Sequence, residues 1–379
     1  MLIRFFNGKI IRNGQIHEAD LWVENGKIVE AGNKPDQEVD LHRQYLAPGY
    51  IDLQINGGFG IDLTTNLSEA QKVSKELLKY GVTTYLATLI SSSKELYHEQ
   101  IPHFKSRQGG LHGATLLGLH LEGPFLNPIQ NGAHSPSFIK DFLEESIESM
   151  YGSLENVKMI TLAPELQGAM DVIKDLRKRG IVVSAGHTDA AEEQLKEGIE
   201  AGITSVTHLF NAMTSFHHRR SGIVGTTLSH PNLYFSIIAD GVHVNDVGIQ
   251  LALKMNSQGL YLVSDAVALW GMKKIDASQG NVDILADAKK AYVAETGRLA
   301  GGLMGLDGNV RHLRVSTGYS IPYAIEAAST KPAQILGMEK ILGSLNIGCN
   351  ADMIVLNEKL QVQATYINGI CVYSSSAPQ

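Results

Sequence analysis

The chain alternates eight times between a short apolar run and a segment of helical character, and this alternation limits its possible folds more than any other feature. The apolar runs cover residues 50–56, 84–90, 117–122, 157–164, 181–187, 205–211, 234–240 and 260–265. Between the first two runs, residues 67–80 place Ala70, Val73 and Leu77 on one face of a helix. Nearly continuous apolar strands that alternate with helices indicate a parallel sheet buried on both faces. Eight such units predict an α/β fold, a closed (β/α)₈ TIM barrel.

An open, doubly wound parallel sheet is the alternative arrangement for such a chain. Its usual signature is a Gly-x-Gly-x-x-Gly turn after an early strand, and the early strands here are not followed by one. A length of 379 residues also suits one large barrel with an accessory domain. We therefore expect the barrel.

Both ends of the chain have a different pattern, that of short strands joined by tight turns. Asn-Gly pairs at residues 7–8 and 25–26 lie between apolar runs, which is the strongest short signal for β-hairpins. A similar pattern returns near the C-terminal end. We predict that residues 1–46 and 347–379 together form a small β-sandwich domain and that residues 47–346 form the barrel.

Composition narrows the class of protein. No apolar run approaches the roughly 20 residues that a membrane-spanning helix needs, and residues 1–14 lack the apolar core of a signal peptide. Only two cysteines occur, Cys349 and Cys371, so we expect no disulfide framework and a reducing, cytoplasmic location. The net charge of −7 argues against non-specific nucleic-acid binding, although a locally basic pocket could still accept a phosphorylated substrate.

Polar residues recur where the predicted strands end. Most of the eight strands end in or lead to Asp, Glu, His, Asn or Gln, namely Asp52, Gln54, Asn56, His120, Glu122, His187, His208, Asn211, Asp240, His243 and Asp265. The active site of a (β/α)₈ barrel lies at the carboxyl ends of its strands. Since an unpaired buried polar group costs about 1–3 kcal/mol, folding alone does not explain so many of them.

Three of these residues, Glu122, His187 and His208, have the composition of a catalytic metal site. One carboxylate and two imidazoles leave a coordination position open for water, as in catalytic zinc sites. Taken singly, Glu122 could instead form a salt bridge inside the barrel, and each histidine could serve only as a hydrogen-bond partner.

Asp265 closes the last predicted strand, after an apolar approach over residues 260–263. A carboxylate there can take a proton from the attacking water and deliver it to the departing nitrogen. The alternative is that Asp265 only caps the following helix, for which Asp is well suited. Its burial at the barrel mouth favours catalysis.

Six motifs resemble those of the N-acetylglucosamine-6-phosphate deacetylases, a family of the amidohydrolase superfamily. They are Asp52-x-Gln54-x-Asn56-Gly57, His120-Leu121-Glu122-Gly123-Pro124, Ala163-Pro164-Glu165, Ser184-Ala185-Gly186-His187, Thr207-His208-Leu209-Phe210-Asn211-Ala212-Met213 and Ala239-Asp240-Gly241-x-His243. The resemblance covers nearly the whole chain. It implies that Glu122, His187 and His208 bind a divalent metal, that Asp265 is the catalytic acid and base, and that His134 helps to polarise the substrate carbonyl.

The resemblance also implies which residues bind the substrate. They are Ala133, His134, Asn211, Ala212, Arg219, His243, Leu299, Ala300 and Gly301. Arg219 and His243 correspond to residues that hold the phosphate, with Arg219 acting either in its own chain or from the neighbouring subunit of a homodimer. The basic run at residues 217–220 suits that role, although such runs are often merely exposed.

The chain departs from the wider superfamily where many members carry His-x-His and hold two metals. Gln54 and Asn56 occupy these second-metal positions, and neutral amides are poor zinc ligands. We therefore expect one metal ion per subunit, Zn²⁺ first, with Fe²⁺, Co²⁺ or Mn²⁺ as alternatives. Residues 269–272 and 301–302 are also unusual, and we expect them near the sugar pocket.

The expected reaction is hydrolysis of the acetamide of N-acetylglucosamine 6-phosphate to glucosamine 6-phosphate and acetate, in amino-sugar catabolism. We expect two partners, this small phosphorylated sugar and a second subunit. We expect no binding to nucleic acid or to a membrane. One alternative is deacetylation of N-acetylgalactosamine 6-phosphate or another N-acylated sugar phosphate. A second is a non-catalytic barrel that serves as a binding module.

Overall fold

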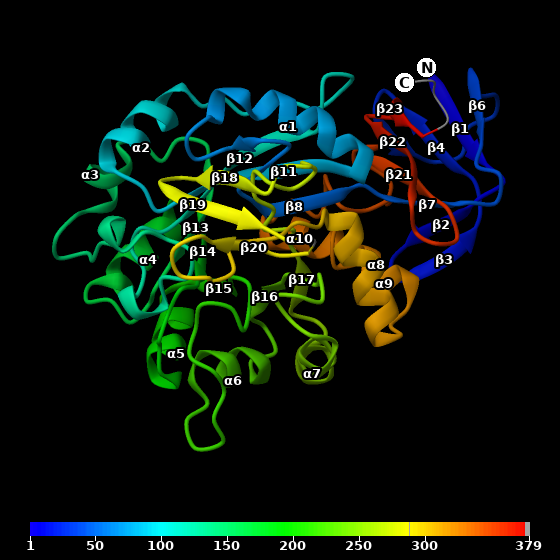
Figure 1. Cartoon of the computed structure of the whole chain (residues 1–379). Helices are drawn as coiled ribbons and strands as arrows, with labels where there is room; N and C mark the ends of the chain where they lie inside the picture. Colours follow the sequence, from blue (N-terminus) through cyan, green and yellow to red (C-terminus); the bar gives the residue numbers. More distant parts are fainter. Residues whose placement is uncertain (288, 376–379) are drawn as a thin grey trace.

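The computed structural model describes residues 1–287 and 289–375 (Figure 1). Its centre is a parallel sheet of eight strands in the order β17-β16-β15-β14-β13-β12-β11-β8. The strands are β8 (Tyr50–Ile55), β11 (Val82–Ile90), β12 (Thr115–Glu122), β13 (Val157–Leu162), β14 (Val182–Ala185), β15 (Ile203–Val206), β16 (Tyr234–Ile237) and β17 (Leu260–Leu262). Each of the eight predicted strands is present, most with slightly different ends.

The end of the first strand pairs with the segment that follows the last strand, and this pairing closes the sheet into a barrel. Ile55 forms a parallel bridge with Ala266. The backbone N–H of Asp265 donates to the carbonyl of Gln54 at 2.9 Å, and that of Asn56 donates to the carbonyl of Ala266 at 2.8 Å. The barrel prediction is therefore confirmed, and the open-sheet alternative is wrong.

Helices lie around the barrel between its strands (Figure 1). They are α1 (Ala70–Leu77), α2 (Lys94–Gln100), α3 (Ile147–Tyr151), α4 (Ala169–Lys178), α5 (Glu192–Ala201), α6 (Gly222–Ser229), α7 (Asp246–Asn256), α8 (Leu306–Thr317), α9 (Ile321–Glu326) and α10 (Thr330–Ile335). Short 3₁₀ turns add η1 (Leu67–Glu69), η2 (Leu78–Tyr80), η3 (Ile101–His103), η4 (Pro128–Gln130) and η5 (Pro136–Phe138). The predicted helix over residues 67–80 is α1 with a 3₁₀ turn at each end, and it buries Ala70, Val73 and Leu77 as expected.

Two further sheets, built from both ends of the chain, pack against each other beside the barrel. One has the order β5-β4-β1-β6 and the other β23-β22-β21-β7-β2-β3. Their strands are β1 (Leu2–Phe6), β2 (Lys9–Arg12), β3 (Gln15–Glu18), β4 (Leu21–Glu24), β5 (Lys27–Val29), β6 (Gln37–Asp40), β7 (Tyr45–Pro48), β21 (Met353–Leu356), β22 (Val362–Ile367) and β23 (Ile370–Ser374). Phe5 and Val23 of the first sheet share a core with Leu46, Met353 and Val355 of the second. The domain boundaries at residues 46 and 347 stay a prediction.

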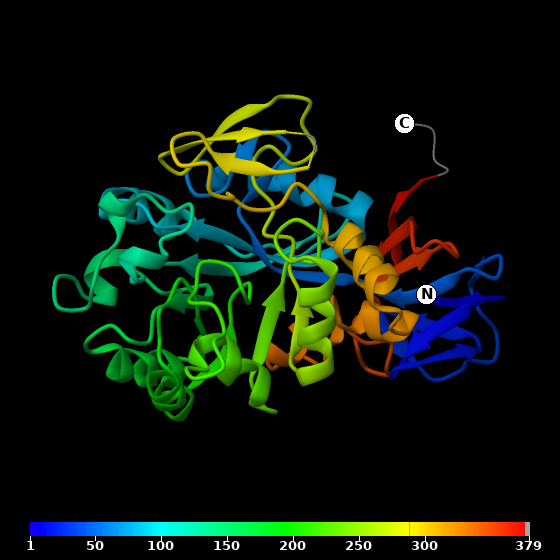
Figure 2. The same ribbon diagram turned by 60° about the horizontal axis from the view of Figure 1, so that its bottom comes forward.

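A three-stranded antiparallel sheet follows the last barrel strand, and it was not expected from the sequence. It consists of β18 (Asp276–Gln279), β19 (Val282–Ala286) and β20 (Ala291–Val293). Figure 2 shows this sheet in yellow as a separate layer over one end of the barrel. Its apolar side chains pack against Val267, Leu269 and Ala300, which lie next to the last strand of the barrel.

Two very short strands, β9 (Gly57–Gly58) and β10 (Ile61–Asp62), form a hairpin directly after β8. None of the helices in the described part of the chain is both long enough and apolar enough to span a membrane.

Candidate metal centre and active site

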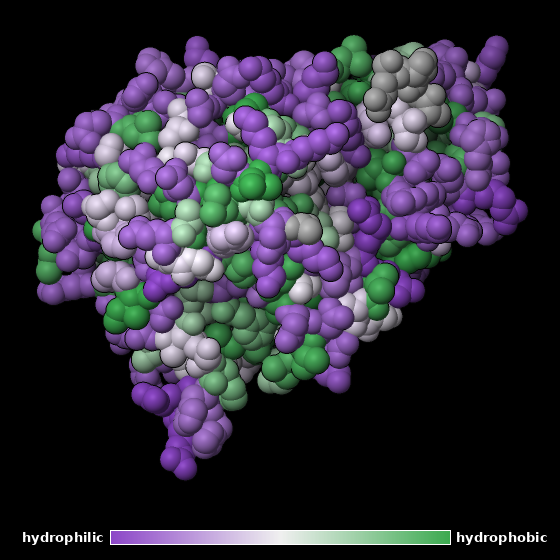
Figure 3. All heavy atoms as spheres, in the orientation of Figure 1, coloured by the Kyte–Doolittle hydropathy of each residue, from purple (hydrophilic) through white to green (hydrophobic). Residues whose placement is uncertain are grey.

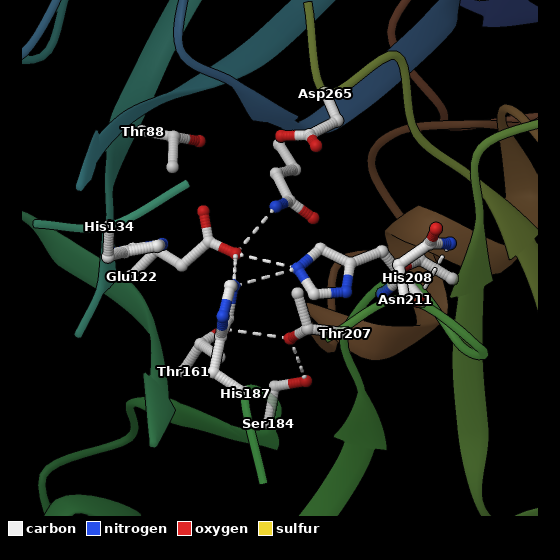
Figure 4. A network of polar contacts seen from close by, with 12 residues as sticks. Thr88, Glu122, His134, Thr161, Ser184, His187, Thr207, His208, Asn211 and Asp265 are labelled. Carbon is white, nitrogen blue, oxygen red and sulfur yellow. Dashed lines mark hydrogen bonds and ion pairs between the residues drawn. The ribbon is translucent and has the colours of Figure 1, made fainter. Parts of the chain in front are cut away.

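Three buried side chains converge at the carboxyl ends of the barrel strands. Glu122 is the last residue of β12, whereas His187 and His208 follow β14 and β15. Glu122 Oε1 lies 3.3 Å from His187 Nε2 and 3.0 Å from His208 Nε2, and the two nitrogens are 3.1 Å apart. Figure 4 shows the three side chains pointing toward one another from different strands. The structure thus brings together the predicted metal ligands.

The donor set of this cluster fits a divalent cation. His187 Nδ1 contacts the backbone carbonyl of Gln130 at 2.9 Å, and only an N–H can donate there, so a neutral His187 directs its Nε2 lone pair into the cluster. Burial raises the pKa of Glu122, but the close approach of His187 and His208 holds that pKa well below its usual range. A carboxylate oxygen and two imidazole nitrogens lie within 4.8 Å of one another, so together they could hold a metal ion.

The backbone is strained at three residues of the site. His187, His208 and Asp265 have φ values of 48°, 35° and 46°. Such left-handed conformations cost non-glycine residues about 1–3 kcal/mol each. His187 and His208 come two residues after a barrel strand and Asp265 comes three residues after one, where the turn directs each side chain into the barrel mouth. The strained conformations thus occur at residues that were predicted to bind the metal or to transfer the proton.

Gln54 and Asn56, at the second-metal positions, act as hydrogen-bond donors. Gln54 Nε2 donates to Glu122 Oε1 at 3.0 Å, and Asn56 Nδ2 donates to Asp265 Oδ1 at 2.6 Å. Each amide therefore orients one carboxylate of the site, a ligand in one case and the expected base in the other.

Asp265 is buried at the barrel mouth. Burial, and after it the charge of Glu122, raises the pKa of Asp265 to about 7, whereas His208 and the hydrogen bond from Asn56 act in the opposite direction. A carboxyl group with a pKa near neutrality can both accept and return a proton.

His134 is a neutral imidazole with a defined tautomer. Burial is the main cause that lowers its pKa to about 3. Its Nδ1 accepts the backbone N–H of Ser91 at 3.2 Å, and the Ser91 hydroxyl lies 2.7 Å from the same nitrogen. The ring proton is therefore on Nε2, where it can be donated to a substrate oxygen.

A cavity of about 360 Å³ lies above these groups and has the size of a small-molecule site. Its lining includes most of the predicted residues: Asn56, Glu122, Ala133, His134, His187, His208, Asn211, Ala212, His243, Asp265, Leu299, Ala300 and Gly301.

His243 Nδ1 donates to the buried carboxylate of Asp240 at 2.8 Å, which fixes the ring. Burial raises the pKa of Asp240, but its hydrogen bond with His243 keeps that pKa below its usual value.

Arg219 is the one predicted substrate residue that lies outside the cavity. The segment between β15 and α6 forms a loop that projects from the molecule (Figure 1), and its tip is hydrophilic in Figure 3. His217, His218, Arg219 and Arg220 are all exposed. Arg219 therefore does not reach the site of its own chain.

Residues 269–272 do not line the cavity of the metal site themselves. Leu269 packs with Ala133 and Ala300, which do line it, so the expectation that this segment lies near the sugar pocket stays a prediction. Trp270 packs instead against Phe59 and Tyr80, with ring centroids 4.7 Å apart in both pairs. Gly301 does line the cavity, and a side chain there would come within 2.6 Å of the Asp265 carbonyl, so the site has room only for glycine.

Several lining residues were not predicted, including Ile90, Ile129, Gln130, Gln279 and Arg298. Gln279 belongs to β18. The only sequence signal for that hairpin was Gly280-Asn281 between short alternating runs, which is a possible hairpin turn.

Comparisons with known proteins agree with this geometry. Residues 45–372 match the amidohydrolase family. The chain is 40% identical to the human N-acetylglucosamine-6-phosphate deacetylase, over 99% of this chain and 97% of that protein. The crystal structure of N-acetylglucosamine-6-phosphate deacetylase from Thermotoga maritima superposes with a TM-score of 0.86 at 30% identity, covering 99% of this chain and 100% of the other. An N-acetylgalactosamine-6-phosphate deacetylase from Escherichia coli O157:H7 is 29% identical over 95% of this chain and 96% of its own length. The chain therefore belongs to the amidohydrolase family and, within it, to the group of the N-acetylglucosamine-6-phosphate deacetylases.

Proposed function

We propose that the protein hydrolyses the acetamide of N-acetylglucosamine 6-phosphate to glucosamine 6-phosphate and acetate, using one divalent metal ion per subunit. The observation that carries the proposal is the convergence of Glu122, His187 and His208 in a cavity that also contains Asp265 and His134. The 40% identity to a deacetylase of that name along nearly the full chain supports the choice of substrate.

Glu122, His187 and His208 would hold the metal, which supplies a Lewis acid that makes water nucleophilic and polarises a carbonyl. Asp265 accepts the proton of the attacking water, since its pKa of about 7 suits a base at neutral pH. The protonated Asp265 then donates to the sugar nitrogen as the C–N bond breaks, which releases a neutral amine.

His134 acts on the carbonyl oxygen of the acetamide. Its Nε2–H donates to that oxygen as negative charge develops on it, and preorganised donors of this kind usually contribute most to acyl transfer. Since burial keeps the ring neutral and Ser91 holds Nδ1, the donor is already oriented before the substrate binds.

The phosphate would bind at the side of the cavity formed by β15 and β16, where His243 and Asn211 lie. Arg219 would complete this site from the neighbouring subunit of a homodimer. Its exposed position on a projecting loop supports this role, because a loop of that kind can reach a second molecule more readily than its own cavity.

Zinc is the metal we propose, because a site with one carboxylate and two imidazoles matches its preferred ligands. Fe²⁺, Co²⁺ and Mn²⁺ are compatible with the same donors. A cytoplasmic location remains a prediction, supported by two cysteines that are both free.

Acetate release tests the proposal. N-acetylglucosamine 6-phosphate should release acetate much faster than unphosphorylated N-acetylglucosamine, and chelation followed by zinc addition should abolish and restore the reaction. Absence of release from both sugars in the metal-loaded protein would refute it. Stoichiometric metal in the purified protein would argue against a non-catalytic binding module, which needs none.

N-acetylgalactosamine 6-phosphate is the second candidate substrate, because a deacetylase of that name is also a relative of the chain. Values of kcat/KM for the two sugar phosphates, measured side by side, separate the candidates. The gluco assignment fails if the galacto sugar has the larger value.

A further inference from the structure

The cavity has a polar side chain that the proposed reaction does not use. Gln279 lines it from β18, and only 5% of the residue is exposed. Its Oε1 is fully buried and has no hydrogen-bond partner within the described residues. A buried amide oxygen without a partner costs about 1–3 kcal/mol, so such groups usually have a partner in the functional state.

The backbone holds Gln279 firmly at this place. The next residue, Gly280, donates its N–H to Asp62 Oδ2 at 2.7 Å, and Asp62 also accepts hydrogen bonds from Thr64 and Thr65. Gly280 packs so closely over the end of β11 that a Cβ would lie 3.2 Å from Ile90 Cδ1. The tip of the β18–β19 hairpin is thus fixed to the barrel rim.

The strand order places Gln279 at a different part of the cavity from the proposed phosphate site. Its hairpin tip is attached at β11 and at the segment after β8, whereas His243 and Asn211 follow β16 and β15. In the closed barrel β17 lies between these two pairs of strands on one side, and β12, β13 and β14 lie between them on the other. The acetamide is proposed to lie at the metal cluster, below both sides. What remains of the sugar for Gln279 to contact is the hydroxyl-bearing edge of the ring.

We infer that Gln279 binds a ring hydroxyl of the sugar phosphate and selects among sugars that differ there. The inference rests on the proposed function, and it assigns a substrate contact to the sheet β18–β20. A hydroxyl group both donates and accepts, so it can satisfy the amide whichever end faces it. A site built to hydrogen-bond a substrate hydroxyl discriminates strongly against an analogue that lacks it.

The test combines variants of Gln279 with deoxy analogues of the substrate. Gln279→Met removes the amide at almost constant length, and Gln279→Ala removes it without adding bulk, in case the first variant does not fold. Ser278→Ala is the matched control, because Ser278 is the preceding residue of the same strand and is exposed. Metal content and the thermal midpoint are measured for each variant. The 1-deoxy, 3-deoxy and 4-deoxy analogues of N-acetylglucosamine 6-phosphate are compared with the parent sugar.

For the wild type, we expect one of the three analogues to lose roughly 10- to 100-fold in kcat/KM. On the parent sugar, kcat/KM of the Gln279 variants should be lower than that of the wild type by a similar factor. Changing from the parent sugar to that same analogue should then lower the kcat/KM of these variants hardly at all. Ser278→Ala should behave like the wild type. Inhibition by the product glucosamine 6-phosphate, which has the hydroxyls but no acetyl group, should weaken by the same factor in the Gln279 variants.

Two results would overturn the inference. One is a Gln279 variant with wild-type kcat/KM on the parent sugar, and the other is a variant whose losses on all three analogues match those of the wild type. Failure of the proposed function is a different result, because the wild type itself would then release no acetate from the parent sugar.

Discussion

Asn56 Nδ2 lies 2.6 Å from Asp265 Oδ1, so a neutral amide donates directly to the carboxylate proposed as the catalytic base. Burial and the charge of Glu122 favour the protonated form of Asp265, and this hydrogen bond favours the charged form. The residue in the second-metal position therefore adjusts the proton affinity of the base.

Replacing Asn56 with Leu should raise the pKa of Asp265, since the lost donor stabilises only the charged carboxylate. Because the base must be ionised to act, the acid limb of kcat/KM should move to higher pH by about one unit. A pH profile of kcat/KM for both proteins measures this, with metal content as the control. An unchanged acid limb would show that Asn56 does not affect the pKa of Asp265.

Asp265→Asn should reduce kcat by roughly 10³-fold or more, because an amide can neither accept nor return the proton. The metal should remain, since the predicted ligands are intact. Steady-state assays with metal analysis of the same preparation check both statements. Substantial turnover in the metal-loaded variant would remove Asp265 from its proposed role.

Arg219→Ala should lower kcat/KM for the phosphorylated sugar mainly by raising KM. If Arg219 acts across a dimer, mixing this variant with Asp265→Asn creates hybrid dimers with one intact site each. A 1:1 mixture that exchanges subunits freely should recover about a quarter of the wild-type sites. Activity measured at low substrate concentration before and after exchange tests this. No recovery in verified hybrid dimers would place Arg219 outside the neighbouring site.

Asp52→Asn should stabilise the metal-free protein at high pH relative to the wild type. Burial raises the pKa of Asp52 from its ordinary range to about 6, and its Oδ2 has no hydrogen-bond partner in the described structure. With a folded-state pKa above the unfolded value, the protonated group contributes stability below pH 4 that is lost as pH rises through 6. The amide variant lacks this dependence.

Urea unfolding of both metal-free proteins at pH 5 and pH 8 measures the effect. The wild type should lose roughly 1–2 kcal/mol between these values in excess of the variant. An equal change in the two proteins would show that Asp52 does not titrate in this range.

The barrel and the cluster of predicted metal ligands could be inferred from the sequence because both follow from local patterns. A strand buried on both faces must be apolar almost throughout, and its polar residues then stand out at its end, as Glu122 does after residues 117–121. His187 and His208 were located in the same way. In each case the signal is a polar residue that ends a strand whose other residues are mostly apolar because they are buried.

The sheet β18–β20 gave no such signal. In β18 and β19 only Gln279 and Ile284 are buried, so the strands lack an apolar run. The packing of Trp270 could not be predicted for a related reason, because its contacts with Phe59 and Tyr80 are distant in sequence. Neither feature could be derived from local pattern alone.

The six-stranded sheet also sets the order in which the protein can be completed during synthesis. Strand β7 pairs with β2 on one side and with β21 on the other. The ribosome makes β2 and β7 early, but β21 begins only at Met353, after every strand of the barrel. At typical translation rates this delay is on the order of tens of seconds. Throughout that time one edge of β7 has no partner strand, so a barrel that folds before Met353 is made stands beside an incomplete sheet, which β21 completes.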